Sequence, residues 1–170
     1  MICFLDIDGT IADVRIRYTK AGYEPGARGK RYSNWLRRVQ NPKLLRADKV
    51  VRGMKEFSNA MYIHCSLVYL TGRSEIYREV TTEWLMHNGF PPTSLVMRPK
   101  SNRQSNGALK ERLINQYLER TRVTVFGSRL PRGPILVIDD DYNGDIEAAC
   151  HRNGWTFLKA KSGSYWHGNK

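Results

Sequence analysis

The chain has 170 residues, of which 41% are hydrophobic, and it carries a net charge of +12. This length supports one domain with a packed core, and no apolar run approaches the roughly 18 residues that span a bilayer, so we expect no membrane contact. The short apolar start ends in acids and has no basic segment before it, which predicts no signal peptide and a cytoplasmic protein. The three cysteines form no C-x-x-C pair, so reduced thiols are expected, and no His/Cys cluster supports zinc.

Apolar residues recur with spacings that predict strands and helices in alternation. The first expected strand is 2–7, and a loop or small insert at 13–34 and one short amphipathic turn follow it. A helix at 48–60 with Asp48 as N-cap, a strand at 62–70 and a helix between Ser74 and Gly89 come next. The rest of the chain is expected to form a strand at 94–98, a helix at 108–121, a strand at 135–138, a helix at 145–154 and a strand at 156–160. Such alternation indicates an α/β fold, in which a parallel sheet carries helices on both faces.

Positive charge is concentrated in residues 14–52, which contain 12 Lys and Arg against two acids. Four aromatic residues are interleaved with them: Tyr18, Tyr23, Tyr32 and Trp35. Basic side chains contact phosphates and aromatic rings stack on bases, so this composition predicts a surface that binds a polyanion. A solvated, adaptable surface segment is the alternative interpretation.

Polar residues follow three of the predicted strands, at the sheet edge where sites form in such folds. Asp6 and Asp8 point to the same side of an extended backbone and repel each other unless a cation lies between them. Together with the acids at 139–141 they offer only oxygen ligands, which predicts Mg²⁺. Thr71 suits a phosphate group and Lys110 can add positive charge. This set of residues predicts phosphoryl transfer through an aspartyl-phosphate.

The motifs "DIDGT", "TGR", a lysine on a helix and "DD" occur in that order. They resemble the four motifs of the haloacid dehalogenase-like (HAD) phosphohydrolases. The resemblance implies a three-layer Rossmann-like α/β fold with a small basic insert after the first strand. We accordingly expect one phosphatase domain over residues 1–160, with a cap or insert at 14–49, and a flexible basic tail at 161–170.

A narrower resemblance joins the chain to the phosphatase domain of phage-type polynucleotide kinases and their stand-alone relatives. It covers about residues 1–12 and 50–160, and it is carried by TGR, Y-R-x-x-T-x-x-W-L, L-x-M-R-P and the helix lysine. The chain has no Gly-x-x-x-x-Gly-Lys-Ser/Thr loop, so no kinase half is expected. It also departs from the family by carrying Asn106 where the pattern has an Asp four residues before the lysine.

The resemblance implies catalytic roles for four residues. Asp6 would attack phosphorus, and Asp8 would protonate the leaving oxygen and then activate water. Thr71 would bind the phosphoryl oxygens, and Lys110 would balance the charge on Asp6 and the phosphate.

The resemblance also implies metal and substrate ligands. Mg²⁺ would be held by the Asp6 carboxylate, the main-chain carbonyl of Asp8 and an acid of 139–141. The two acids of the fourth motif are either Asp139 and Asp140, or Asp140 and Asp141 together with the later Asp145. Asp140 belongs to both alternatives. The predicted substrate-binding residues are Gly72, Arg73, Arg98 and Asn106.

These observations lead to three hypotheses about function. The first is a Mg²⁺-dependent phosphatase acting on phosphorylated nucleic-acid ends or nucleotides, with a polynucleotide 3′-phosphatase as its most specific form. The second is a 5′-nucleotidase acting on free nucleoside monophosphates. The third is a nucleic-acid-binding module that has lost turnover and uses its basic segment.

Overall fold

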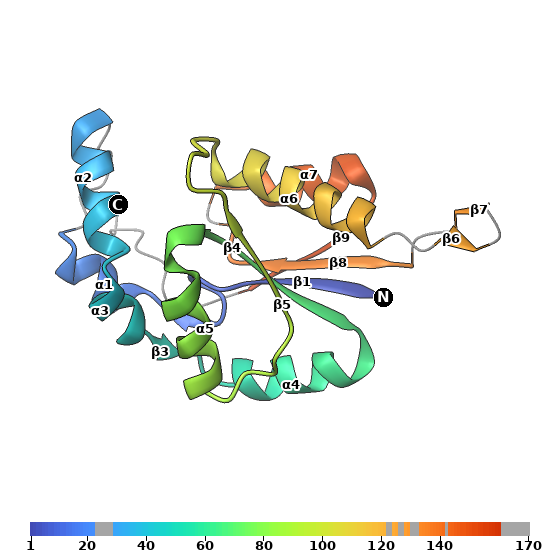
Figure 1. Cartoon of the computed structure of the whole chain (residues 1–170), viewed down its shortest axis with the longest axis horizontal. Coiled ribbons are helices and arrows are strands. Elements are labelled where there is room, and N and C mark those ends of the chain that lie inside the picture. Colours follow the sequence, from blue (N-terminus) through green and yellow to red (C-terminus); the bar gives the residue numbers. More distant parts are fainter. Residues whose placement is uncertain (23–28, 122–123, 126–127, 130–132, 142, 161–170) are drawn as a thin grey trace.

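A five-stranded parallel sheet forms the centre of the computed structural model, which describes residues 1–22, 29–121, 124–125, 128–129, 133–141 and 143–160. The strands lie in the order β5-β4-β1-β8-β9, and every neighbouring pair is parallel (Figure 1). Their bounds are β1 Ile2–Asp6, β4 Ser66–Ser74, β5 Ser94–Arg98, β8 Ile135–Asp139 and β9 Thr156–Lys159. The predicted α/β fold with a parallel sheet is confirmed.

Helices cover both faces of this sheet, as Figure 1 shows. One face carries α6 (Asn106–Arg120) and α7 (Asp145–Asn153), and the other carries α4 (Met54–His64) and α5 (Arg78–His87), which follows the short 3₁₀ helix Glu75–Tyr77. Successive residues of a strand pack in different cores, because their side chains point to opposite faces of the sheet. Thus Phe4 packs in the core under α6 and α7, whereas Cys3 and Leu5 pack in the core under α4 and α5.

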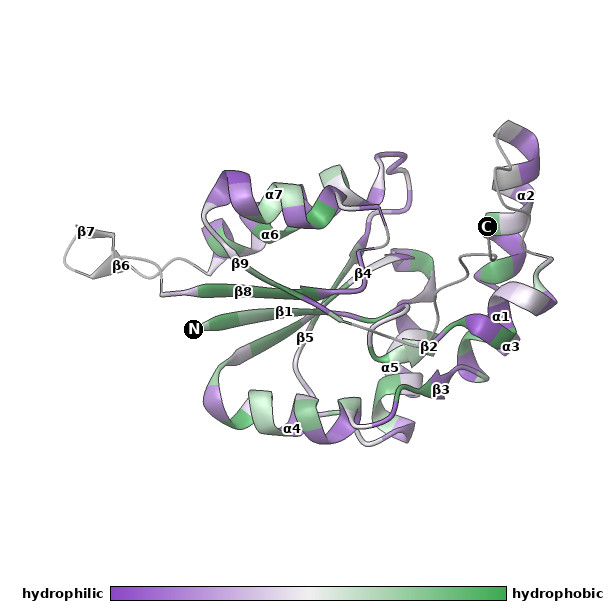
Figure 2. Ribbon diagram, turned by 180° about the vertical axis from the view of Figure 1, so that it is seen from behind, coloured by the Kyte–Doolittle hydropathy of each residue, from purple (hydrophilic) through white to green (hydrophobic). Residues whose placement is uncertain are grey.

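Residues between β1 and α4 form a helical insert beside the carboxyl end of the sheet (Figures 1 and 2). Its elements are β2 Ala12–Asp13, α1 Arg15–Lys20, α2 Gly29–Val39, α3 Pro42–Arg46 and β3 Lys49–Val50. Strands β2 and β3 pair antiparallel and bring the two ends of the insert together. The insert has a small core of its own, formed by Ala21, Trp35 and Val39 with Tyr18 and Leu44 packed against it.

The insert region is more helical than its sequence indicates. The segment 13–34, expected as a loop or small insert, contains all of α1 and the start of α2. The single amphipathic turn expected after it is wrong, because those residues belong to an 11-residue helix. Trp35 and Val39 lie four residues apart on α2 and bury one face of it against the insert core, which stabilises a longer helix than local composition indicates.

The region around the second strand also differs from the prediction. Residues 62–64 belong to the last turn of α4, not to a strand, and β4 extends to Ser74. Met54, Phe57 and Met61 of α4 pack against the core, while Ile63 is 76% exposed, so helical packing overrides the strand preference of these residues. Asp48 is not the N-cap of this helix, because α4 begins at Met54 after Gly53.

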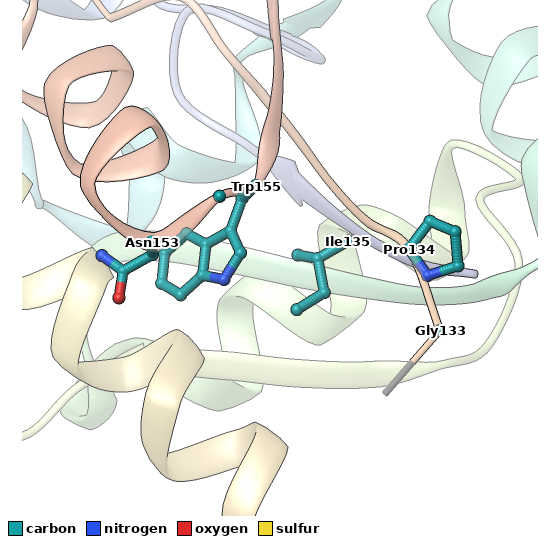
Figure 3. A pocket seen from close by; sticks show the side chains of 6 residues that line it. Gly133, Pro134, Ile135, Asn153 and Trp155 are labelled. Atoms are coloured by element: carbon teal, nitrogen blue, oxygen red, sulfur yellow. The ribbon is translucent and has the colours of Figure 1, made fainter. Parts of the chain in front are cut away.

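Other features lie at the opposite end of the sheet. The short strands β6 (Thr124–Val125) and β7 (Ser128–Arg129) form a separate pair before β8. A hollow lined by Pro134, Ile135, Asn153 and Trp155 lies where β8 and β9 begin, as Figure 3 shows, far from the acids at the strand ends. Among the described helices, none combines the length and apolar character needed to cross a bilayer. The tail predicted at 161–170 lies outside the described residues.

Candidate active site

Two carboxylates and one ammonium group meet where β1 and β8 end. Asp6 is the last residue of β1 and Asp139 is the last residue of β8. Lys110, from the second turn of α6, lies between them, with Nζ 2.7 Å from Asp6 Oδ1 and 2.5 Å from Asp139 Oδ2. All three side chains are at most 6% exposed. Parallel strand register and one helix therefore bring together residues that are more than 100 positions apart in the sequence.

Burial and neighbouring negative charges raise the pKa values of two acids in this cluster, Asp6 and Asp140. Burial raises the pKa of Asp6 well above its ordinary value, and nearby Asp139 and Asp140 raise it further, although Lys110 acts in the opposite direction. Burial, followed by Asp139, raises the pKa of Asp140 to about 7. For Lys110 the two carboxylates outweigh the effect of burial and raise its pKa above the ordinary range. One ammonium group therefore does not neutralise this acidic edge.

A divalent cation fits these donors. One carboxylate oxygen from each of Asp6, Asp139 and Asp140 lies within 4.8 Å of the others. The donors are all oxygens, which suits a hard cation such as Mg²⁺. Gly9 permits the close approach of Asp140, because a Cβ atom at this position would lie only 2.1 Å from Asp140 Oδ2, and its φ of +88° also favours glycine.

We predict that Mg²⁺ stabilises the folded protein, because binding at the acidic cluster relieves repulsion that is absent in the unfolded chain. At a concentration of about 100 times its Kd, the ion should add about 2.7 kcal/mol to the free energy of unfolding. Thermal unfolding with Mg²⁺ and with EDTA measures this effect, and NaCl at equal ionic strength is the control. An unfolding temperature that is the same with Mg²⁺ and with EDTA would argue against a metal site at the acidic cluster.

The carboxylate of Asp8 is bound by two arginines, not by the acidic cluster. Arg73 Nε lies 3.0 Å from Asp8 Oδ2 and its Nη2 lies 2.7 Å from Oδ1, while Arg17 Nη2 donates to Oδ1 as well. The same arginines contact Asp48, which is buried behind them. Burial opposes ionisation of Asp8, but Arg17 and Arg73 outweigh it and hold its pKa well below the usual range. Asp8 is therefore ionised in this arrangement.

The remaining predicted ligands lie on β4, at the end of β5 and at the start of α6. Thr71 is fully buried and follows Leu70, the residue that pairs with Asp6, and its hydroxyl accepts the amide of Arg73 at 3.1 Å. Beside it, Arg98 Nε donates to the Gly72 carbonyl at 3.0 Å and Nη2 donates to Asn106 Oδ1 at 2.5 Å. A Cβ atom on Gly72 would lie 2.9 Å from that same oxygen, so glycine permits this contact. These residues form a second group next to the acids.

Asp141 has a different role from its two neighbours. Its carboxylate oxygens accept the amides of Ile146 at 3.1 Å and Glu147 at 2.9 Å, so it caps the start of α7. Asp145 contacts Asn143 on the surface. Of the two motif pairs left open by the sequence, the geometry therefore favours Asp139 with Asp140.

Comparisons with known proteins agree with this architecture. No protein-family model matches the sequence, and a comparison with curated proteins found no match. Among solved structures, a haloacid dehalogenase-like hydrolase from Streptococcus pneumoniae matches with a TM-score of 0.64 and 14% identity, over 93% of this chain and 83% of that one. A structure titled putative phosphoglycolate phosphatase from Lactobacillus plantarum matches with a TM-score of 0.60 and 14% identity, over 94% and 84%.

The chain shares the fold of these solved structures. A structure of the Pnkp1/Rnl/Hen1 RNA repair complex contains this fold too, and matches with a TM-score of 0.63 and 17% identity. That match covers 96% of this chain and 43% of the other, so the chain spans less than half of the repair protein. Identities this low show the shared HAD-like fold and leave the activity to be argued from the site.

Two residues of the site in this HAD-like fold were missed by sequence reasoning, Arg17 and Asp48. Both come from the insert, and both are buried against residues of the sheet edge. Composition places Arg17 only within a basic surface, and local spacing predicts Asp48 only as a helix cap. The available signal was that Asp48 is one of only two acids in a long basic segment, although sequence spacing cannot reveal that it pairs with arginines 31 and 25 residues away.

Proposed function

We propose that the chain is a Mg²⁺-dependent phosphatase that acts on phosphomonoesters of nucleic-acid ends or nucleotides, and most specifically a polynucleotide 3′-phosphatase. The observation that carries the proposal is the convergence of Asp6, Lys110, Asp139 and Asp140 at one sheet edge. Such a site combines a fixed carboxylate nucleophile with the positive charge that a transferring phosphoryl group needs. The HAD-like hydrolase fold supports the same chemistry.

Phosphate hydrolysis at this site takes place in two steps, in which Asp6, Lys110 and Thr71 have different roles. An oxygen of Asp6 attacks phosphorus, the bond to the leaving oxygen breaks, and an aspartyl-phosphate forms on Asp6. Water then attacks phosphorus and releases the Asp6 carboxylate with inorganic phosphate. Lys110 holds Asp6 in position and Thr71 offers its hydroxyl proton to the phosphoryl oxygens. Bound Mg²⁺ would neutralise negative charge as it develops on those oxygens.

Asp8 acts as the acid and then the base in this scheme. It gives a proton to the leaving oxygen in the first step and takes one from water in the second. An acid that donates a proton must first carry one, whereas Arg17 and Arg73 hold Asp8 ionised in this structure. Catalysis by Asp8 therefore requires the two guanidinium groups to turn from Asp8 toward another anion, and the substrate phosphate is such an anion.

The insert supports a polynucleotide as the substrate. Lys30 and Arg37 are exposed on α2, and because they are seven residues apart they share one face of the helix. Within the part of the chain that the structure describes, no carboxylate lies within ion-pair distance of either residue. Figure 2 shows hydrophilic segments along this helix. The match to a protein of an RNA repair complex also favours nucleic-acid ends over free nucleotides.

A substrate panel tests the proposal directly. Purified protein with Mg²⁺ is incubated with oligonucleotides of DNA and RNA that carry 3′- or 5′-phosphates, with nucleoside monophosphates and with an aryl phosphate. We expect release from 3′-phosphate ends to exceed release from mononucleotides. Equal rates on mononucleotides and polymer ends would favour the 5′-nucleotidase hypothesis. Salt-dependent binding without any phosphate release would favour a binding module.

We predict that the double substitution Lys30→Gln and Arg37→Gln weakens the use of oligonucleotides and spares small substrates. Each lost contact with a phosphate of single-stranded nucleic acid should reduce the slope of log affinity against log salt by about 0.7. KM for an oligonucleotide should therefore rise while kcat on an aryl phosphate stays unchanged. The control is Lys55→Gln with Arg120→Gln, which removes equal charge from α4 and α6. An equal effect of both pairs would contradict a binding surface on α2.

A further inference from the structure

A buried carboxylate of the insert, Asp48, lies at the centre of the charges around Asp8. Its Oδ1 accepts a hydrogen bond from Arg17 Nε at 3.0 Å, and its Oδ2 accepts one from Arg73 Nη2 at 3.0 Å. The side chains of Asp48 and both arginines are at most 3% exposed, whereas that of Asp8 is 21% exposed. The arginines thus lie between an inner carboxylate that is closed to solvent and an outer one that faces it.

The position of Asp48 is fixed by contacts that do not involve the arginines. Its main-chain oxygen accepts the indole N–H of Trp84 at 2.8 Å. The next residue, Lys49, pairs with Asp13 in the β2–β3 ladder. Trp84 also lies under Arg73, with the guanidinium carbon 6.0 Å from its ring centroid. Asp48 can therefore keep its place when the arginines change their other partner.

Charge balance explains why the pair of arginines needs this carboxylate. Two neighbouring guanidinium groups repel each other, and burial makes an unbalanced charge more costly. Asp8 alone would leave one of the two positive charges without a partner. Asp48 supplies a second negative charge that touches neither the acidic cluster nor Lys110 in the described structure.

We propose that Asp48 is a positioning residue that holds Arg17 and Arg73 at the sheet edge while these arginines exchange Asp8 for the substrate phosphate. The inference rests on the proposed phosphatase function. Arg73 Nη1 is buried and has no hydrogen-bond partner among the described residues, so it is a further donor for the incoming anion. The bonds from Arg17 Nε and Arg73 Nη2 to Asp48 keep the guanidinium planes aligned during the exchange.

Asp48→Asn tests the proposal with an isosteric change. With Mg²⁺ and an aryl phosphate, kcat/KM should fall by about a hundredfold, because small misplacement of charged groups costs that much. The matched control is Glu83→Gln, which removes a carboxylate from the exposed ion pair that joins Arg46 of α3 to α5 and should keep kcat/KM. Retention of kcat/KM by Asp48→Asn within about threefold would overturn the proposal.

A second measurement separates positioning from folding and from turnover. Binding of inorganic phosphate in the presence of Mg²⁺, followed by calorimetry, should weaken about tenfold in Asp48→Asn and show no further change when Arg17→Gln and Arg73→Gln are already present. An equal loss in both backgrounds would overturn the proposal. If Asp48→Asn does not fold, the same binding measurement is made on Asp48→Glu. Weaker phosphate binding at an unchanged unfolding temperature would support a positioning role for Asp48. Phosphate binding equal to that of the wild type would contradict it. A wild-type protein that binds phosphate without releasing any from substrates would refute the phosphatase proposal alone.

Discussion

Asp6→Asn should abolish phosphate release while the protein stays folded. The amide has the shape of the carboxylate but cannot attack phosphorus, so we expect turnover to fall by on the order of 10⁴-fold or more. The substitution also removes one charge from a crowded acidic cluster, and Lys110 keeps its contact with Asp139. The unfolding temperature without metal should therefore stay close to that of the wild type or rise.

Two measurements check this prediction. Phosphate release is followed on an aryl phosphate with Mg²⁺, and acid-quenched samples are tested for labelled phosphate attached to the protein. The wild type should yield the labelled acyl-phosphate and Asp6→Asn should not. Asp13→Asn makes the same chemical change in the surface ion pair with Arg15 and should leave turnover unaffected. Full turnover by Asp6→Asn would refute the aspartyl-phosphate mechanism.

Lys110→Met should destabilise the protein as well as inactivate it. The ammonium group is the shared partner of two buried carboxylates, and removing one member of a buried charge cluster costs about 3–5 kcal/mol. The loss should be larger at pH 8 than at pH 5. Burial already raises the folded-state pKa of Asp6 above its unfolded value, so Asp6 takes up a proton at low pH and loses it at a cost in stability as the pH rises.

Urea unfolding of Lys110→Met with and without Mg²⁺ measures this effect. Mg²⁺ should recover part of the lost stability, since a cation at the cluster replaces some of the missing positive charge. Arg120→Met on the same helix removes an exposed charge and should change the free energy of unfolding by less than about 0.5 kcal/mol. Equal stability of Lys110→Met and the wild type in EDTA would mean that Lys110 does not hold the two acids.

Much of the fold follows from short-range sequence patterns. The apolar runs before Asp6 and Asp139 predict buried strands, and the spacing on α6 predicts which face of that helix packs on the sheet. Because parallel strands end at a common edge, the amino-acid sequence alone predicts that the polar residues after these strands lie together. Lys110 joins them because its helix begins at the same edge.

The insert was harder to predict because its order depends on distant partners. Its helices are polar outside one small core, so their sequences resemble a loop. The pairing of Arg17 with Asp48 spans 31 residues and leaves no periodic signal. Residues 62–64 were predicted to lie in a strand from their local strand preference, but they lie in α4 because the tertiary packing of this helix outweighs that preference. Local patterns record local preferences, whereas these features are set by contacts between segments.

The pairing of β2 with β3 makes the insert an exchangeable module. Both of its ends meet at one two-stranded ladder, Ala12 with Val50 and Asp13 with Lys49. The segment between them has a small core of its own, and its α3 also packs on α5. A chimaera could therefore receive a foreign cap at this ladder without disturbing the central strands. The graft would have to retain an arginine and an aspartate equivalent to Arg17 and Asp48, since these two side chains are what the module contributes to the chemistry beneath it.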